Sequence, residues 1–302
     1  MRPEDARRLV ELAMQKVAEN YSNNPLNSDG FYRETIKKRK EYLSISEALV
    51  DIYKGSYTKE FDEDKVKIYK GRKSSNVKRA DTLAVKMQGG PYVSLLFDVV
   101  KNPYVLIAST DLYNYDFTVT DIKTVDNKLM YEVGFKPRVI DPDYPMYIGK
   151  YFIDVKSLGV SSVEFSIDLS DPDKAASMFV KKKPMGVKIT PTSTSYIVTY
   201  KEMNGRYFFN YSRSEMNFKC NWKKKLFNSN YSVMAELAIT DWSMKPAEKF
   251  TAKESLKKTS VFEEEVTAFM DDNFWGEHNT IEPDQSIQTA IKKYGRRLQK
   301  EK

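Results

Sequence analysis

Alternation of apolar and polar side chains predicts a β-sheet with one covered face in this chain. The clearest run is "GVSSVEFSIDLS" (159–170), in which every second residue from Val163 to Leu169 is apolar and the residues between are Glu, Ser and Asp. A two-residue period is that of a strand, because successive side chains point to opposite faces of a sheet. We therefore expect one face of this sheet to meet solvent and the other to be buried.

Turn-forming residues between such runs predict antiparallel hairpins. Asn204-Gly205 is the strongest two-residue hairpin signal in the chain, and Asp126-Asn127 separates the extended runs 115–125 and 129–135. A turn within the polar run Lys37–Glu41 would pair 31–36 with 42–53. A further strand is expected from about Tyr231 to Thr240.

Helical periodicity is confined to shorter segments. Apolar residues recur every three to four positions in 4–20, and "GGPYVSLLFDVVKNP" (89–103) has Pro91 where a first helical turn accepts it. Asp171 before Pro172 predicts an N-cap and a further helix start. Helices are also expected from Val261 to about Phe274 and from Ser286 to Leu298.

The order of these elements predicts an α+β fold with a strongly curved antiparallel sheet, a half-barrel, an N-terminal helix and short interposed helices. We expect residues 1–245 to form this half-barrel domain. Residues 246–302 are expected to form a helical C-terminal extension that packs on the same domain.

One acidic residue interrupts an apolar strand face. Leu43, Ile45 and Leu49 share a face with Glu47 if this segment is extended. A turn near residues 39–40 would place Arg33 opposite Glu47, and a cross-strand ion pair would then explain the acid. The alternative is a polar pair that contacts a ligand in a concave pocket.

Composition and charge narrow the class of protein without selecting a function. The 302 residues are 41% hydrophobic and 30% charged, with a net charge of +7, which is typical of a folded globular protein. Basic runs lie at 37–40, 181–183 and 223–225. Solvated strand ends are the favoured interpretation, and contact of Trp222, Lys223, Lys224 and Lys225 with an anionic surface is the alternative. Nucleic-acid binding is less favoured than either.

Residues for recognisable catalysis are missing from the chain. A single histidine, His278, cannot supply a two-imidazole zinc site, and no G-x-S-x-G or phosphate-binding glycine motif is present. Cys220 is the single cysteine, so an intrachain disulfide is impossible. No apolar run reaches the roughly 18 residues that span a bilayer. We expect no enzyme activity, metal or cofactor.

Several blocks of the chain resemble a family of Gram-negative cell-envelope proteins, the carboxypeptidase-like regulatory domain-containing proteins. The resemblance rests on "NPLNSDGFYRETIKKRKEYLSISEALVDIYKGSY", "DTLAVKMQGGP", "DVVKNP", "GKYFIDVKSLGVSSVEFSIDLSD", "NFKCNWKKKLFNSNYSVMAEL" and "NFWGEHNTIEP". It implies an exported protein in the periplasm or at the periplasmic face of the outer membrane, here without the β-sandwich that gives the family its name. More weakly, residues 5–240 resemble the periplasmic lipoprotein-carrier half-barrel, whose concave side takes acyl chains.

These resemblances favour a non-enzymatic envelope protein that binds a lipid or other apolar ligand at the concave face of its sheet. Met87, Tyr92 and Phe97 are candidate groove-lining residues, with ordinary core packing as the alternative. The rival functions are a scaffold that contacts an envelope protein and a hydrolase with an unrecognised site. The volume of the concave side distinguishes a binding protein from a scaffold, because an open half-barrel has a cavity of several hundred Å³.

Overall fold

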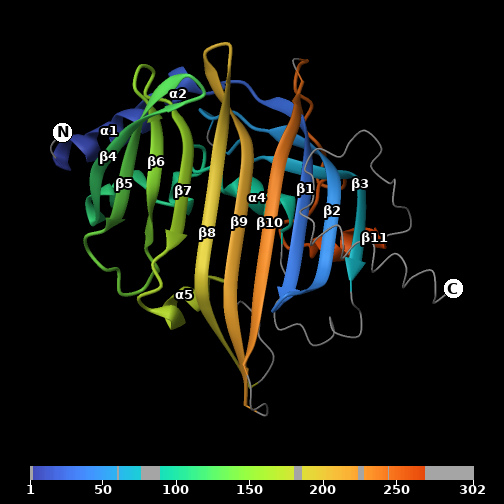
Figure 1. The fold of residues 1–302 in the computed structure, drawn as a ribbon. Helices are drawn as coiled ribbons and strands as arrows, with labels where there is room; N and C mark the ends of the chain where they lie inside the picture. Colours follow the sequence, from blue (N-terminus) through green and yellow to red (C-terminus); the bar gives the residue numbers. More distant parts are fainter. Residues whose placement is uncertain are drawn as a thin grey trace.

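A computed structural model describes residues 3–59, 61–75, 89–179, 186–223, 228–243 and 245–268. Within these residues the strands form one sheet, in the order β11-β3-β2-β1-β10-β9-β8-β7-β6-β5-β4 (Figure 1). The strands are β1 (Leu26–Lys38), β2 (Glu41–Lys54), β3 (Lys65–Ser75), β4 (Tyr115–Val125), β5 (Lys128–Pro137), β6 (Tyr147–Asp154), β7 (Val160–Ile167), β8 (Val187–Met203), β9 (Arg206–Trp222), β10 (Ser229–Trp242) and β11 (Thr267–Ala268). All pairs are antiparallel except β11 with β3. The predicted fold class, a curved antiparallel half-barrel of the α+β type, is confirmed.

The sheet consists of two meanders that meet at one pair of strands. Strands β4 to β10 pair in sequence order, as do β1 to β3, and β1 joins the two sets by pairing with β10. The hairpin turns follow the sequence signals: Asn204 and Gly205 both have positive φ, as do Asp126 and Asn127. Glycine and asparagine tolerate this backbone geometry, which the tightest hairpin turns require.

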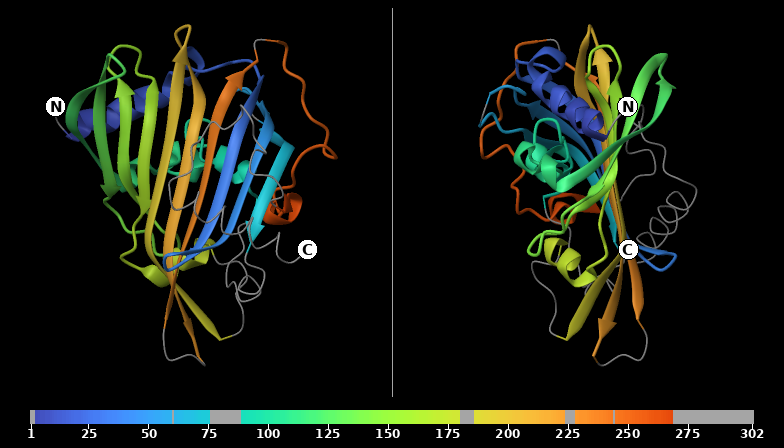
Figure 2. Two further views of the ribbon diagram at one scale, coloured as in Figure 1. Left: turned by 45° about the vertical axis from the view of Figure 1, so that its right-hand side comes forward. Right: turned by 90° about the vertical axis from the view of Figure 1, so that its left-hand side faces the viewer.

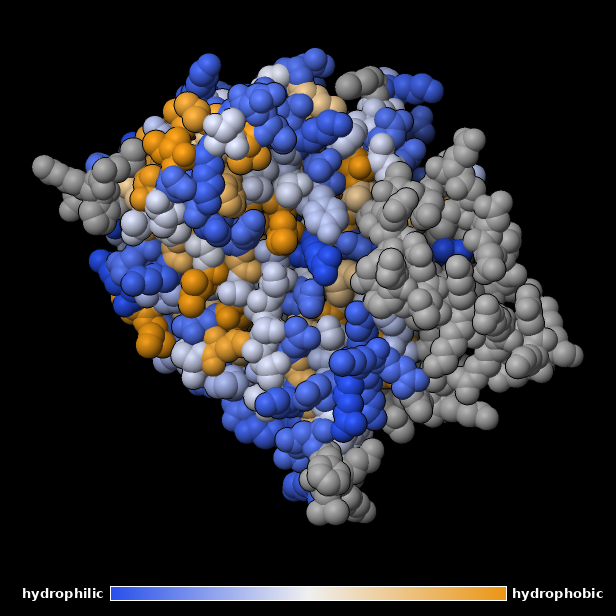
Figure 3. Space-filling model, viewed as in Figure 1, coloured by the Kyte–Doolittle hydropathy of each residue, from blue (hydrophilic) through white to orange (hydrophobic). Residues whose placement is uncertain are grey.

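Helices and irregular segments cover one face of the sheet. They are α1 (Pro3–Gln15), α2 (Val17–Asn20), α4 (Pro91–Leu96), η1 (Pro103–Val105), η2 (Ser109–Asn114), α5 (Pro172–Phe179) and α6 (Phe262–Glu265). Edge-on, α1, α4 and the segment with α6 lie on the same side, which we call the inner face (Figure 2). The opposite face is the outer face, which Figures 1 and 3 show from the front.

The main hydrophobic core lies between this cover and the inner face. It joins apolar residues of α1 and α4 to inward-facing residues from β1 to β10. Tyr21 is fully buried and donates a hydrogen bond from its hydroxyl to the Val160 carbonyl oxygen, 2.6 Å away. The segment after α2 is thereby fixed to β7, on the other side of the core.

The segment after β10 runs along the edge of the sheet, and we call residues 245–268 the strap. The Leu256 amide donates to the Val66 carbonyl oxygen of β3 at 2.8 Å, and Phe262 packs edge-to-face on Tyr32 with ring centroids 4.8 Å apart. Gly90 is required opposite Phe262, because a Cβ there would lie 2.9 Å from the Phe262 Cβ and Gly90 has a φ of +48°.

The strap corrects part of the helix prediction for the C-terminal region. The helix expected from Val261 to about Phe274 ends at Glu265, and residues 267–268 continue as β11 against β3. The reason is tertiary: Val266 is buried against Gly71, and strand pairing satisfies the backbone beyond it. The second expected helix, Ser286–Leu298, lies outside the described residues, so the helical extension stays a prediction.

Candidate functional site

A network of buried charges lies between β2, the β2–β3 loop and the segment after α4. Asp98 has no exposed surface, and Lys54 is 5% exposed. The Lys54 ammonium lies 2.7 Å from Asp98 Oδ2 and also contacts Asp64 Oδ2, and Lys101 Nζ contacts Asp64 Oδ1. Two lysines and two aspartates therefore neutralise one another, as buried charges require.

Hydroxyl and amide donors complete the coordination of Asp98. Tyr57 donates to Oδ2 at 2.7 Å and Tyr200 donates to Oδ1 at 2.8 Å, and the Lys101 amide donates to Oδ1 at 3.2 Å. Burial alone would raise the pKa of Asp98, but Lys54 and the hydroxyl groups of Tyr57 and Tyr200 hold it below the ordinary value for a carboxyl group. Asp98 is therefore a carboxylate in the folded protein, and it links β2 and β8 to the loop after α4.

Asp64 and Lys101 of this network line a groove on the inner side of the sheet. The groove has a volume of about 710 Å³ and is bounded by the β2–β3 loop, α4, the residues after α4 and the strap. Its apolar lining includes Tyr92, Val93, Leu95 and Leu96 of α4. Its charged lining is Lys59, Asp62, Glu63, Asp64, Lys101 and Lys258. A volume of this size is within the range of small-molecule sites.

Two aromatic rings stand exposed at the groove. Phe61 is 87% exposed and Tyr104 is 69% exposed, although both line it. Phe61 has a φ of +66°, a backbone geometry that costs energy for a bulky residue. The β2–β3 loop holds this geometry because Asp62 accepts hydrogen bonds from Tyr53 and from the Ser56 amide.

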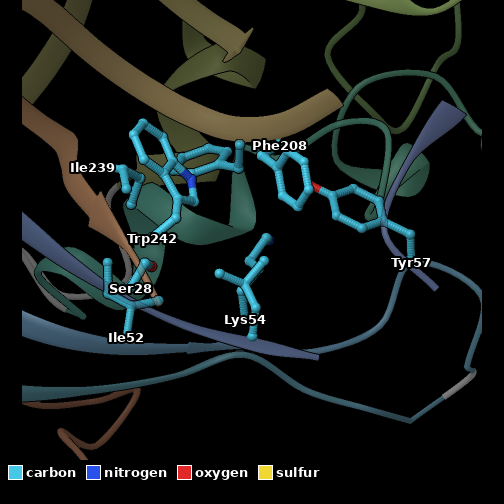
Figure 4. A pocket seen from close by; sticks show the side chains of 9 residues that line it. Ser28, Ile52, Lys54, Tyr57, Phe208, Ile239 and Trp242 are labelled. Carbon is cyan, nitrogen blue, oxygen red and sulfur yellow. The ribbon is translucent and has the colours of Figure 1, made fainter. Parts of the chain in front are cut away.

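A second hollow, directly under the sheet, is almost filled. Figure 4 shows its lining, in which Trp242 and Phe208 face Ile52 and Lys54 across a small space. Its volume is about 10 Å³, which is room for about one water molecule. The inner face at this point is therefore occupied by the protein's own side chains, and the larger groove lies beside α4 instead.

Arg33 and Glu47 lie on the outer face, directly opposite each other on β1 and β2. Arg33 Nε donates to Glu47 Oε1 at 2.8 Å, and both residues are at most 1% exposed. Glu47 also binds Arg72 of β3 at 2.9 Å, and Arg33 also binds Glu236 of β10 at 3.1 Å. The pair is therefore part of a charge network on the outer face, away from the groove.

The other predicted site residues separate in space. Tyr92 lines the groove, whereas the Phe97 ring packs on Tyr196 with centroids 5.0 Å apart. Trp222 is half-buried beside a second core cluster at the end of β9, and Lys223 is exposed in the turn that follows. Met87, Lys224, Lys225, the basic run 181–183 and His278 lie outside the described residues. A role of these residues in ligand or surface binding stays a prediction.

Burial makes Cys220 a structural residue. The thiol lies in the second core cluster, and burial raises its pKa to about 11. A thiol of that pKa is almost entirely protonated at neutral pH and is a poor nucleophile.

In the described part of the chain, no three acidic, histidine or cysteine side chains are grouped to hold a metal ion. No helix there has the length and hydropathy needed to cross a bilayer.

Sequence reasoning missed the Lys54–Asp64–Asp98–Lys101 network. Its members are separated by up to 47 positions and no spacing connects them. A signal was nevertheless present, because Asp98 interrupts the apolar run "LLFDVV" (95–100) as Glu47 interrupts its strand face. A single acid in an apolar run indicates a buried partner.

Comparison with known proteins gave no family and several structures. No family model matches the chain, and no curated protein does. A structure described as an outer membrane lipoprotein-sorting protein domain from Vibrio parahaemolyticus is 9% identical, with a TM-score of 0.31 over 82% of this chain and 96% of that one. A DUF1329 family protein from Desulfovibrio piger is 12% identical, with a TM-score of 0.27 over 79% and 94%. A LolA superfamily protein from Nitrosomonas europaea is 9% identical, with a TM-score of 0.26 over 83% and 97%.

Scores of this size carry no argument about what the chain binds. The fold class rests on the strand order and pairing described above. The resemblance to the carboxypeptidase-like regulatory domain-containing proteins stays a prediction.

Proposed function

We propose that the protein is a non-enzymatic binding protein for an apolar or amphipathic ligand, such as a lipid. The groove of about 710 Å³ beside α4 supports this proposal, because it combines an apolar floor with a charged rim. The lining residue Asp64 connects one wall of the groove to the buried Lys54. An envelope location follows from the sequence resemblance alone and is part of the proposal.

Among the described residues, none at the groove is a poised nucleophile or base, which favours binding over catalysis. Each carboxylate that lines it has a lysine partner: Asp64 with Lys101, Glu63 with Lys258 and Asp62 with Lys249. The surroundings hold the pKa of Asp62 below its ordinary value, because hydrogen bonds from Lys249, the Ser56 amide and Tyr53 outweigh the effect of burial. A carboxylate in such a setting is a weak general base.

Native mass spectrometry of the purified protein tests the proposal, together with titration by N-phenyl-1-naphthylamine, an uncharged dye that fluoresces in apolar sites. We expect a co-purified lipid mass or saturable dye binding. Leu96→Glu places a charge on the groove floor and should abolish it. Ile148→Glu, at an exposed position of β6, is the matched control and should bind as the wild type does. Absence of both a bound mass and saturable dye binding in the wild type would overturn the proposal.

A scaffold function is the second candidate, supported by a different observation. The inner face under β1, β2, β9 and β10 is filled by the chain's own side chains, with about 10 Å³ left. A filled half-barrel can act through its surfaces, where Val139, Ile140 and Tyr144 expose 52%, 72% and 71% of their area between β5 and β6. A protein that binds no dye but retains a partner on an affinity column would support this candidate.

A further inference from the structure

One lysine at the groove has no acidic partner among the described residues. Among the described residues, each acid that lines the groove has a lysine partner, as shown above, and no acid lies within ion-pair distance of Lys59. Lys59 is exposed and lies on the β2–β3 loop, two residues before Phe61. The described lining of the groove therefore offers one cation without an acidic partner.

The groove also exposes apolar surface to solvent. Phe61 and Tyr104 expose most of their rings, while Leu95, Leu96 and Tyr92 form an apolar floor. An apolar chain between the rings and this floor would remove that surface from water, which favours binding. Strained backbone such as that at Phe61 is concentrated at active sites and ligand clamps.

We infer that the groove selects an amphiphile with one apolar chain and an anionic head, and that Lys59 contacts the head. The inference rests on the proposed binding function and names the ligand class. Lys59 supplies three N–H donors to a carboxylate or phosphate, and such charge-assisted hydrogen bonds are stronger than neutral ones. The chain of the ligand lies under Phe61 and Tyr104, against α4.

Displacement of N-phenyl-1-naphthylamine by three amphiphiles with the same twelve-carbon chain tests the inference. The probes are laurate, dodecyl phosphate and dodecyl maltoside, each below its micelle concentration. We expect laurate and dodecyl phosphate each to compete at least tenfold better than the maltoside. Comparison of the laurate and dodecyl phosphate affinities shows whether a carboxylate or a phosphate is preferred. Lys59→Gln should weaken both anions about tenfold and leave the maltoside unchanged.

Lys40→Gln is the matched control, because Lys40 is an exposed lysine in the β1–β2 turn and does not line the groove. It should leave all three affinities unchanged. Equal competition by all three probes would overturn the inference and leave the proposed function standing. A preference for anions that Lys59→Gln does not alter would overturn the assignment of Lys59. Failure of every probe to displace a dye that binds would overturn the inference. Failure of the dye itself to bind would also overturn the inference and, together with the absence of a co-purified lipid mass, would overturn the proposed function.

Discussion

Arg33 and Glu47 face each other across β1 and β2 at a hydrogen-bond distance of 2.8 Å, and both are buried on the outer face. The pair belongs to a row that crosses the sheet in register. From β6 to β3 the row reads Lys150, Glu164, Ile197, Arg213, Glu236, Arg33, Glu47 and Arg72. Opposite charges alternate along it except at Ile197. Directly opposed charges of this kind stabilise a particular strand register.

A double-mutant cycle tests the coupling of this pair. Arg33→Ala and Glu47→Ala should each reduce the free energy of unfolding by about 3 kcal/mol, because each removes one partner of a buried charge. The double variant should lose at least about 1 kcal/mol less than the sum. Denaturation in urea measures all three.

An exposed pair of the same protein provides the control for this cycle. Lys188 and Asp173 lie 3.0 Å apart with side chains 62% and 70% exposed, so their coupling should be near zero. Equal coupling in the two cycles would show that burial of Arg33 and Glu47 has no energetic consequence.

Asp98 should contribute stability that depends on pH. Its pKa in the folded protein lies below the ordinary value of 3.8, so the stabilisation is complete above that pH and is lost as the pH falls through the folded pKa. Asp98→Asn should cost about 3–5 kcal/mol at pH 7, since Lys54 is left buried without one of its carboxylates. Urea denaturation at pH 7 and pH 3 should show a smaller difference at pH 3. Asp143→Asn, at an exposed turn, should have little effect at either pH.

Glu34 should produce the opposite pH dependence. Burial, with a smaller contribution from the nearby Glu263, raises its pKa to about 8, although a hydrogen bond from Tyr32 opposes the rise. The folded protein thus binds a proton that the unfolded chain releases above its ordinary pKa of 4.5, so stability falls with pH up to about pH 8, by about 1.4 kcal/mol per unit. Glu34→Gln should remove this slope from the midpoint of thermal unfolding. An unchanged slope would show that Glu34 does not titrate in this range.

Phe61→Gly should separate stability from binding. Glycine adopts a φ of +66° without strain, and the Phe61 ring is exposed, so we expect the folded protein to gain about 0.5–1 kcal/mol. Affinity of the groove for dodecyl chains should fall at the same time. Thermal unfolding and dye displacement on the same sample measure the two effects. A loss of stability would indicate that the ring contributes packing in the free protein.

The fold was largely predictable from local pattern, because its hairpin turns have distinctive chemistry. Asn204-Gly205 and Asp126-Asn127 lie in tight turns, and Asp171 accepts a hydrogen bond from the Lys174 amide at 3.0 Å as an N-cap. The paired strands followed from these turns. The turn expected near residues 39–40 set the strand register well enough to place Arg33 opposite Glu47.

What the sequence did not predict depends on contacts between distant segments. In strand β3, "KVKIYKGRKSS", apolar and polar residues alternate poorly. Its position in the sheet depends on pairing with β2 and on contact with the strap. The strap itself is irregular, and the groove exists because this segment and the β2–β3 loop meet beside α4. No local propensity encodes such a meeting of segments.

The pairing of β1 with β10 determines when this protein can fold. Arg33 and Glu236 are 203 positions apart, so the two meanders cannot join until the chain has been made as far as β10. Until then, β1 and the last completed strand of the other meander both present unpaired backbone. Long-range pairing of this kind slows folding and leaves strand edges open to aggregation. During synthesis, these two strand edges therefore need protection from aggregation until β1 pairs with β10.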